Sequence, residues 1–323
     1  MVRIRPTIET SLRISSEIDP KPVRIRFFGV RGSFQGDDQR IGHHTSCIVI
    51  EYGDSITICD TGSGVRNFGA EIMQEYTMRG REVRVNVLYT HMHGDHTFGL
   101  PSFDPLFSPK THMHFIGGTH TFKRESHDGT IETWEETVHE TLQRQILVEP
   151  TFPINYRELP CKRTFQLVRP GERFTIPSSY GDIVVDCDIM NHPGRAYGYR
   201  FHFGNDKVLA LVLDHEHEPE KPEFDQKILR LCDRATLTIG EVQYTKRFYD
   251  GHMPNGISFR KGWGHMWAEA AARQFEEART THVITTHHEP KFGLPEVTEI
   301  VRTINETTGI RTDYAFQSME VTL

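Results

Sequence analysis

The chain has 323 residues, of which 37% are hydrophobic, and a formal net charge of -7. This length and apolar content suffice for a large core, which we expect to belong to one elaborated domain. The excess of acidic residues argues against a long nucleic acid bound along the surface, because tracking of phosphates requires an excess of lysine and arginine. A small anionic ligand in a local basic pocket is compatible with this charge.

Membrane insertion and cysteine chemistry are both disfavoured. The chain opens without a segment like a signal peptide, and no stretch approaches the ~20 apolar residues that a membrane-spanning helix needs. We therefore expect a cytoplasmic protein that does not contact a membrane. The five cysteines show no CxxC spacing, so neither a disulfide framework nor a thiolate zinc cluster is predicted.

The first half of the chain is predicted to be rich in strands. Residues 1–22 are interpreted as an N-terminal extension and residues 23–323 as the domain. Short β-like runs at 23–30, 45–52 and 55–60 are followed by a helical pattern at 64–80 and a buried strand at 82–90. Residues 103 to about 165 are rich in proline and aromatic residues and are predicted to form an insertion with one helix at 130–146.

The second half returns to an alternation of strands and helices. Strands are expected at 181–190, 196–204, 207–214, 235–242 and 281–287, and helices near 220–233, 265–279 and 294–308, the last completing the chain. Strand blocks that alternate with helices in two halves predict a layered α/β fold, with two mixed sheets packed face to face and helices outside.

The stretch "LYTHMHGDHTFGL", residues 88–100, concentrates metal-ligand side chains directly after a strand. His91 and His93 are two residues apart, so both imidazoles point the same way in an extended segment and can share one cation. Asp95 and His96 follow where the chain turns into a helix, and they face a neighbouring position. Imidazole and carboxylate groups are ligands for zinc, manganese or iron, so the spacing predicts a site for two divalent metal ions.

The segment "THMHGDH" resembles the HxHxDH signature of the metallo-β-lactamase superfamily, whose fold is an αββα sandwich. "NHPGRAYGYRF", "LALVLDHEH" and "VITTHHEP" resemble the later segments that complete its metal site. The resemblance implies that His192 joins His91 and His93 on one metal, that Asp214 bridges the two metals, and that His287 joins Asp95 and His96 on the second. "ICDTGSG" resembles an early turn in which Asp60 orients one of the ligands.

The same resemblance implies hydrolysis. Two metal ions lower the pKa of water, so a hydroxide nucleophile is available at neutral pH, and they stabilise the oxyanion that develops during attack. Asp95 is implied to be catalytic as well as a ligand, because it would hold the hydroxide for in-line attack.

"RFFGVRGSF", "HHTSCIVIEYG", "GWGHM" and "THHEP" are most similar to the phosphodiesterase branch of the superfamily, which includes tRNase Z, phosphoribosyl cyclic phosphate phosphodiesterase and cyclic-nucleotide phosphodiesterases. In tRNase Z-like enzymes the histidine of a GHST segment protonates the departing oxygen. Here Gly264 and His265 match, whereas Met266 and Trp267 replace the serine and threonine. His265 is therefore a candidate general acid, with a capping or packing role as the alternative.

The substrate is predicted to be a small cyclic or linear nucleotide-like phosphodiester. Lys261 and Trp263 precede His265, and Arg195 lies in the loop of His192, so these three residues are candidate substrate contacts. A tRNA-grasping arm has no clear equivalent, because the insertion contains the acidic "TWEETVHETLQ". The insertion is interpreted as a lid or a subunit contact, and a homodimer is expected because the branch is often dimeric.

Other functions were weighed against this one. A hydrolase of a lactone, thioester or β-lactam with the same fold is the first alternative, and a tRNA 3'-end endonuclease is the second. A di-iron redox enzyme would be expected to bring a flavin-binding domain and a carboxylate in place of His93. An inactive binding module would normally have lost a ligand, whereas the implied set is complete.

Overall fold

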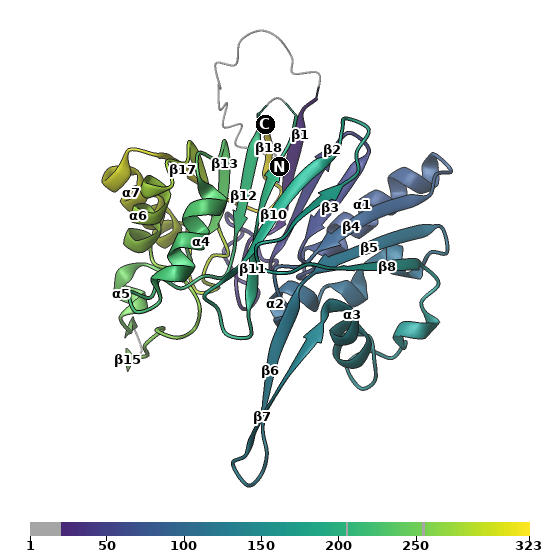
Figure 1. Ribbon diagram of the computed structural model, residues 1–323, viewed down its shortest axis with the longest axis horizontal. Coiled ribbons are helices and arrows are strands. Elements are labelled where there is room, and N and C mark those ends of the chain that lie inside the picture. Colours follow the sequence, from purple (N-terminus) through teal and green to yellow (C-terminus); the bar gives the residue numbers. More distant parts are fainter. Residues whose placement is uncertain (1–20, 205, 254–255) are drawn as a thin grey trace, which may run out of the picture.

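The computed structural model describes residues 21–204, 206–253 and 256–323, so residues 1–20 of the predicted N-terminal extension lie outside the described residues. Two large mixed sheets pack against each other, with helices on the outside of each sheet (Figure 1). The layered α/β sandwich predicted from the sequence is confirmed. None of the helices in the described part of the chain combines the length and the apolar character needed to cross a membrane.

The first sheet has the strand order β18-β1-β2-β3-β4-β5-β8. Its strands are β1 (Val23–Gly29), β2 (Cys47–Tyr52), β3 (Ser55–Cys59), β4 (Val83–Leu88), β5 (Thr111–Gly117), β8 (Lys162–Leu167) and β18 (Glu320–Thr322). Neighbouring strands run antiparallel from β18 to β3 and parallel from β3 to β8. Side chains alternate between its two faces. Ile48 and Ile50 pack in the core between the sheets, whereas Val49 faces the opposite side with helix α1 (Val65–Met78).

The second sheet has the same plan, with the order β17-β16-β13-β12-β11-β10-β9. Its strands are β9 (Arg173–Ile176), β10 (Ile183–Met190), β11 (Ala196–His202), β12 (Val208–Val212), β13 (Leu237–Glu241), β16 (His282–Thr286) and β17 (Arg311–Tyr314). Pairing is parallel from β17 to β12 and antiparallel from β12 to β9. Helices α4 (Pro222–Cys232), α6 (Ala268–Glu277) and α7 (Leu294–Thr308) cover its outer side (Figure 1).

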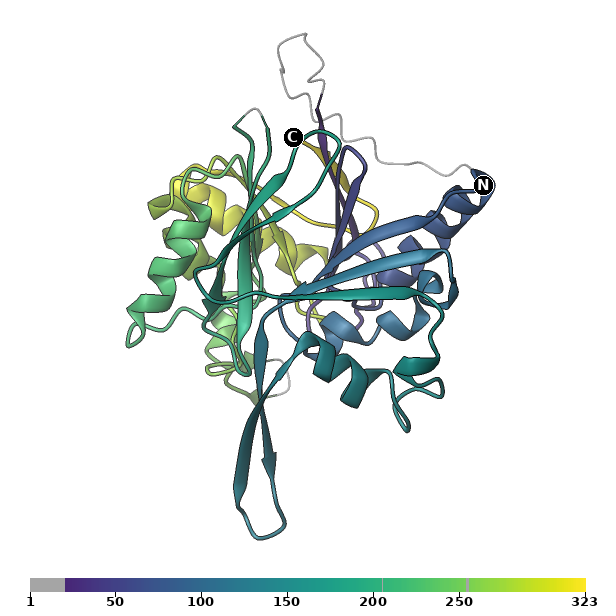
Figure 2. The same cartoon turned by 45° about the vertical axis from the view of Figure 1, so that its right-hand side comes forward.

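The helix predicted at 130–146 is wrong in its first half. Residues 119–125 and 131–137 form the antiparallel strands β6 (Thr119–Glu125) and β7 (Ile131–Thr137), a hairpin that projects away from the sandwich (Figures 1 and 2). β-branched and aromatic residues are frequent in β7, and Phe122 stacks on Trp134 across the pair with ring centroids 5.7 Å apart. Helical structure begins only at α3 (Val138–Thr141), where the Thr137 side chain caps the helix.

Other corrections concern short strands. β5 and β8 belong to the first sheet although they lie within the predicted insertion at 103–165, so only the chain between them leaves the sandwich. Helix α7 has the predicted bounds but does not complete the chain, because β17 and β18 follow and add a strand to each sheet. The remaining short elements are α2 (Gly94–Thr97), α5 (Lys246–Tyr249), β14 (His252–Met253) and β15 (Gly256–Ile257).

A fully buried arginine joins the loop between β1 and β2 to the loop between β16 and α7. The Arg31 guanidinium donates to the carbonyl oxygens of Gly42 (2.8 Å), Phe292 (2.8 Å) and Glu289 (3.1 Å). Burial lowers the pKa of Arg31, although nearby carboxylates oppose the shift. Because Arg31 has no hydrogen bond to a carboxylate side chain among the described residues, its charge is balanced mainly by oriented backbone dipoles.

We predict that Arg31→Leu lowers the free energy of unfolding by about 3 kcal/mol, because three buried carbonyl groups lose their donor. Urea denaturation followed by circular dichroism measures the change. The matched control is Arg302→Leu on α7, where the guanidinium is exposed and lies 3.6 Å from Glu306, and this change is expected to cost less than about 0.5 kcal/mol. An Arg31→Leu protein as stable as the control would contradict the bracing role.

Candidate metal centre

The ends of strands from both sheets deliver the predicted ligands to one edge of the sandwich. His91 follows β4, His192 follows β10, Asp214 follows β12 and His287 follows β16. The carboxyl ends of neighbouring parallel strands meet at one edge of a sheet, so residues nearly two hundred positions apart can converge there. All seven predicted ligands lie within this one cluster.

Three imidazoles form the first half of the cluster. The Nε2 atom of His91 and the Nε2 atom of His192 each lie 2.9 Å from Nδ1 of His93. His91 and His192 are buried, whereas the His93 side chain borders solvent. The three nitrogen atoms point at one common position, as predicted from the His91 and His93 spacing and from the resemblance of the His192 segment.

The second half of the cluster contains Asp95, His96 and His287. Nε2 of His96 and Nε2 of His287 are 3.0 Å apart, and Oδ2 of Asp95 lies 3.3 Å from the former and 3.1 Å from the latter. The backbone amide of Ser33 also donates to Oδ2 of Asp95 at 2.7 Å, which fixes the plane of that carboxylate. The "GVRGSF" loop is therefore part of the site wall.

Asp214 lies between the two halves and turns one oxygen to each. Its Oδ2 is 3.6 Å from Nε2 of His91 and 3.7 Å from Nε2 of His192. Its Oδ1 is 3.4 Å from Nε2 of both His96 and His287, is buried, and accepts no hydrogen bond. A buried carboxylate oxygen without a donor is costly, and a cation at each side of Asp214 would compensate it.

The cluster fits two divalent cations. Ligand atoms ~2.0–2.1 Å from a zinc ion stand about 3.3 Å apart at the corners of a tetrahedron. The distances of 2.9 Å in the first half and 3.0 to 3.3 Å in the second are close to this spacing. Burial lowers the pKa of His192 to about 3 and also lowers the pKa of His91 and of His93, which favours the neutral imidazole that ligates a metal. The donor set contains no thiolate, so it suits a reactive centre better than a closed structural zinc site.

Each buried imidazole is oriented through its second nitrogen. Nδ1 of His96 donates to Oδ2 of Asp60 at 2.7 Å, and the amide and hydroxyl of Thr90 donate to the same carboxylate. Nδ1 of His91 donates to the Thr90 hydroxyl at 3.1 Å. These bonds leave Nε2 of His91 and His96 free to ligate, which is the orienting role that the resemblance implies for Asp60.

Two further orienting groups were not predicted from the sequence. Nδ1 of His287 donates to Oε1 of Gln243 at 2.9 Å, and Nδ1 of His192 donates to the carbonyl oxygen of Gly264 at 3.0 Å. A side chain at Gly264 would lie 2.1 Å from Nδ1 of His192, so only glycine permits this approach. Gln243 carries no sequence signal, because it follows its strand by two residues in an apolar context.

Backbone strain gathers at the same place. Ser33, Asp60, Asp214 and His287 have positive φ angles of 59°, 61°, 51° and 58°. This left-handed conformation is disfavoured for residues with a side chain, and the surrounding structure must enforce it. At Asp60, Asp214 and His287 it turns the chain sharply after a strand and directs the side chain toward the cluster, whereas at Ser33 it presents the backbone amide to Asp95.

His265 lies beside the cluster and faces a buried carboxylate. Its Nδ1 atom is 3.4 Å from Oε1 of Glu241 and 3.8 Å from Oδ2 of Asp214, and it is buried without a well-aligned hydrogen bond. Burial alone would lower the pKa of His265, but the contact with Glu241 outweighs it and raises the pKa above its ordinary value. The Glu241 contact therefore favours the protonated form of His265 relative to an ordinary buried histidine.

Glu241 was not predicted. It ends β13 and is fully buried, and its carboxylate accepts the amides of Gln243 (3.1 Å) and Met266 (3.1 Å). The only sequence signal is an acidic residue at the end of the apolar run "ATLTIGEV". An acid in such a strand is rarely buried without a partner, which could have identified it.

A second buried carboxylate shapes the loop that carries His265. Glu216 accepts the backbone amides of Gly262 (2.8 Å) and Gly264 (2.8 Å) and the Tyr249 hydroxyl (2.6 Å). It lies two residues after Asp214, so one strand end supplies both the bridging candidate and the support for this loop. Glu216 stands in the sequence within "DHEH", but its role depends on its tertiary contact with the loop before His265.

The three predicted substrate contacts lie in different surroundings. Arg195 is engaged by the hairpin, because its guanidinium donates to Oγ1 of Thr119 at 2.7 Å and to Glu135 at 2.8 Å. Lys261 and Trp263 are exposed on the loop before His265, and the Trp263 side chain is 52% accessible. A role for Arg195 would therefore require its ion pair with Glu135 to open.

A sandwich of two mixed sheets with a histidine and aspartate cluster at the strand ends defines a metallohydrolase architecture. The chain belongs to the β-lactamase superfamily, since residues 57–288 match the family described as "Beta-lactamase superfamily domain". The histidine and aspartate cluster marks it as a metal-binding member of this hydrolase family.

Individual relatives agree with this assignment. Ribonuclease Z from Staphylococcus aureus (strain Newman) is 21% identical over 331 aligned residues, which cover 88% of this chain and 95% of the relative. The metallo-beta-lactamase fold protein YhfI from Bacillus subtilis superposes with a TM-score of 0.65 at 14% identity, over 94% of this chain and 100% of the other. A diphosphatase from the PhnP family has a TM-score of 0.58 at 13% identity, over 93% and 97%.

We predict that Asp60→Ala weakens metal binding about 10- to 100-fold, because His96 loses the acceptor that sets its tautomer and ring plane. Zinc affinity would be measured by competition with a chromophoric chelator. The control is Asp54→Ala, on an exposed turn that bonds to Ser179, and it should bind zinc like the unchanged protein. Equal zinc affinity of the Asp60→Ala protein would show that Asp60 does not support the site.

Proposed function

We propose that this protein is a dinuclear metal-dependent phosphodiesterase that hydrolyses small cyclic or linear nucleotide-like phosphodiesters. The observation that carries the proposal is the buried His265–Glu241 pair beside the ligand cluster. An alkoxide that departs from a phosphodiester is a poor leaving group and needs a proton, whereas a lactone or β-lactam ring makes less demand for one. A buried histidine whose pKa is raised by Glu241 and that lies next to the ligand cluster meets this need.

The ligand set is proposed to be His91, His93 and His192 for one ion, Asp95, His96 and His287 for the other, and Asp214 for both. Zinc is the preferred metal, with manganese or iron as alternatives. When bound, such a pair of cations supplies a hydroxide nucleophile at neutral pH and neutralises charge that develops on the attacked group.

The side chains then divide the remaining work. Asp95, whose plane is set by the Ser33 amide, holds the attacking water in line with the phosphorus atom. His265 gives its proton to the departing oxygen, and Glu241 holds that proton on the ring until transfer. Lys261 and Trp263, which are exposed before His265, are proposed to contact the substrate, as is Arg195 once it is released from Glu135.

Two similar proteins support phosphate chemistry, since one is a ribonuclease and another a diphosphatase. The match to Ribonuclease Z over 88% of this chain favours tRNA 3'-end cleavage as the second candidate. The projecting hairpin argues for the smaller substrate, because residues 119–137 carry two basic residues, Lys123 and Arg124, and five acidic ones. A cytoplasmic homodimer that does not contact a membrane is part of the same proposal.

A panel of substrates tests the function. Metal-loaded protein is expected to hydrolyse bis(p-nitrophenyl) phosphate and at least one cyclic mononucleotide, with release of nitrophenolate or of the monoester followed by absorbance and chromatography. Precursor tRNA, a thioester and a lactone complete the panel. Cleavage of precursor tRNA alone would favour the endonuclease, and turnover of only the thioester or lactone would overturn the phosphodiesterase.

The acid role of His265 predicts a dependence on the leaving group. His265→Ala should lower kcat for a cyclic mononucleotide about 10²- to 10⁴-fold, and affect bis(p-nitrophenyl) phosphate much less, since nitrophenolate departs without a proton. A purely structural role would reduce both substrates equally.

Glu241→Gln should move the alkaline limb of the pH profile of kcat/KM. The Glu241 carboxylate stabilises the imidazolium, so His265 loses its proton at a higher pH than an ordinary histidine. Removal of the negative charge lowers this pKa, and activity should then fall at a pH about 1 to 2 units lower. An alkaline limb that stays in place would assign it to another group.

A further inference from the structure

The loop before His265 carries a guanidinium that is buried without an acidic partner. The Arg260 residue is only 6% accessible, and its Nη1 donates to the carbonyl oxygen and hydroxyl of Ser258 at 3.3 and 2.8 Å. Its Nε is buried and has no partner. Among the residues that the structure describes, no carboxylate lies within ion-pair distance of Arg260.

Two aromatic rings enclose this guanidinium. Its central carbon lies 4.4 Å from the centroid of Trp263 and 5.2 Å from that of Phe248. Cation–π contact compensates part of the lost hydration, but it leaves the buried Nε–H group without an acceptor. A planar cation that is flanked by two rings and keeps an unsatisfied Nε–H donor can accept an anion as its missing partner.

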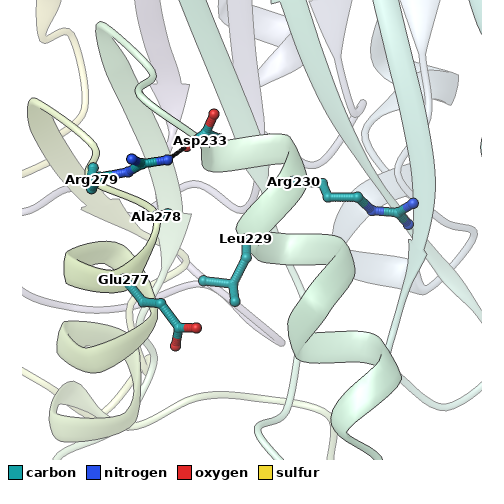
Figure 3. A pocket seen from close by; sticks show the side chains of 6 residues that line it. All are labelled: Leu229, Arg230, Asp233, Glu277, Ala278 and Arg279. Atoms are coloured by element: carbon teal, nitrogen blue, oxygen red, sulfur yellow. Dashed lines mark hydrogen bonds and ion pairs between the residues drawn. The ribbon is translucent and has the colours of Figure 1, made fainter.

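The two arginines of another surface pocket have acidic partners and do not share this property. The shallow pocket between α4 and α6 is lined by Leu229, Arg230, Asp233, Glu277, Ala278 and Arg279 (Figure 3). There Arg279 pairs with Asp233 at 2.7 Å, and Arg230 pairs with Asp188 at 2.7 Å. Those charges are already balanced, so this pocket offers no free cation to a ligand.

The position of Arg260 connects it to the metal centre. Phe248 stacks on Tyr244 with centroids 5.5 Å apart, and Tyr244 packs edge-on against the His265 ring at 5.8 Å. Packing through Phe248 and Tyr244 therefore connects the Arg260 guanidinium to the His265 ring. Trp263 lies on the same loop and is half exposed, which leaves the guanidinium next to an open aromatic surface.

We propose that Arg260 binds a phosphoryl oxygen of the substrate, in a subsite walled by Trp263 and Phe248. This inference rests on the proposed phosphodiesterase function and selects one substrate contact among the basic residues near His265, which the sequence alone does not rank. The positive charge that binds the phosphoryl group is then the buried guanidinium of Arg260. The neighbouring Lys261 is exposed to solvent. An aromatic wall next to the phosphoryl site also suits a substrate with a planar base.

The binding of AMP to the metal-loaded full chain, measured by isothermal titration calorimetry, tests the subsite without turnover. Arg260→Met is expected to weaken AMP binding about 10-fold and to leave the binding of adenosine, which lacks the phosphoryl group, unchanged. Arg260→Lys retains the charge but loses the planar fork, and it should fall between the two. In turnover of a cyclic mononucleotide the same changes should raise KM more than they lower kcat.

The matched control is Arg247→Met, an exposed arginine on the neighbouring α5, which should bind AMP like the unchanged protein. AMP binding by folded Arg260→Met that equals this control would overturn the subsite, and so would an absence of AMP binding by the unchanged protein. If Arg260→Met does not fold by circular dichroism, Arg260→Lys decides, and unweakened AMP binding by it overturns the inference. Failure of the phosphodiesterase proposal would instead appear as AMP binding that depends on Arg260 without turnover of any phosphodiester.

Discussion

The close packing of imidazole nitrogen and carboxylate oxygen acceptors around Asp214 is the constraint on which the rest of the structure depends. Five imidazoles and two carboxylates turn their acceptor atoms toward each other at distances of 2.9 to 3.7 Å. Such an arrangement is unfavourable in a buried site unless cations or protons lie between the acceptors. The fold holds it in place through strand ends, and those strands draw their stability from the core between the two sheets.

The strand ends alone do not orient the ligands. Asp60, Thr90, Gln243 and the Gly264 carbonyl each accept or relay a hydrogen bond from the far side of an imidazole, so the ring plane and the tautomer are set before any cation arrives. The positive φ angles of Asp60, Asp214 and His287 show that the backbone is strained to achieve this aim. Preorganisation of this kind is expected where reactivity is favoured over local stability.

Buried carboxylates outside the ligand cluster connect it to the substrate side. Glu216 accepts hydrogen bonds from the backbone amides of Gly262 and Gly264. The Gly264 carbonyl of this loop orients His192, and His265 follows the loop directly. Glu241 then sets the protonation of His265. One continuous segment therefore links the proposed metal ligand His192, the proposed proton donor His265 and, through Arg260 and Trp263, the proposed contact with a phosphoryl group.

The sequence by itself determined the parts of this protein that depend on local spacing. "THMHGDH" places four ligand candidates within six residues, and α7 has its predicted bounds because its periodicity and its terminal glycine act within the helix. The later ligands His192, Asp214 and His287 were assigned only by resemblance, since no local pattern distinguishes them from other histidines and acids. Only the tertiary structure decided that residues 131–137 form a strand, because pairing with β6 and the Phe122–Trp134 stack outweigh a helical pattern. The roles of Glu241, Glu216 and Arg260 likewise depend on which distant groups surround them, and burial and charge balance arise only when the chain is folded.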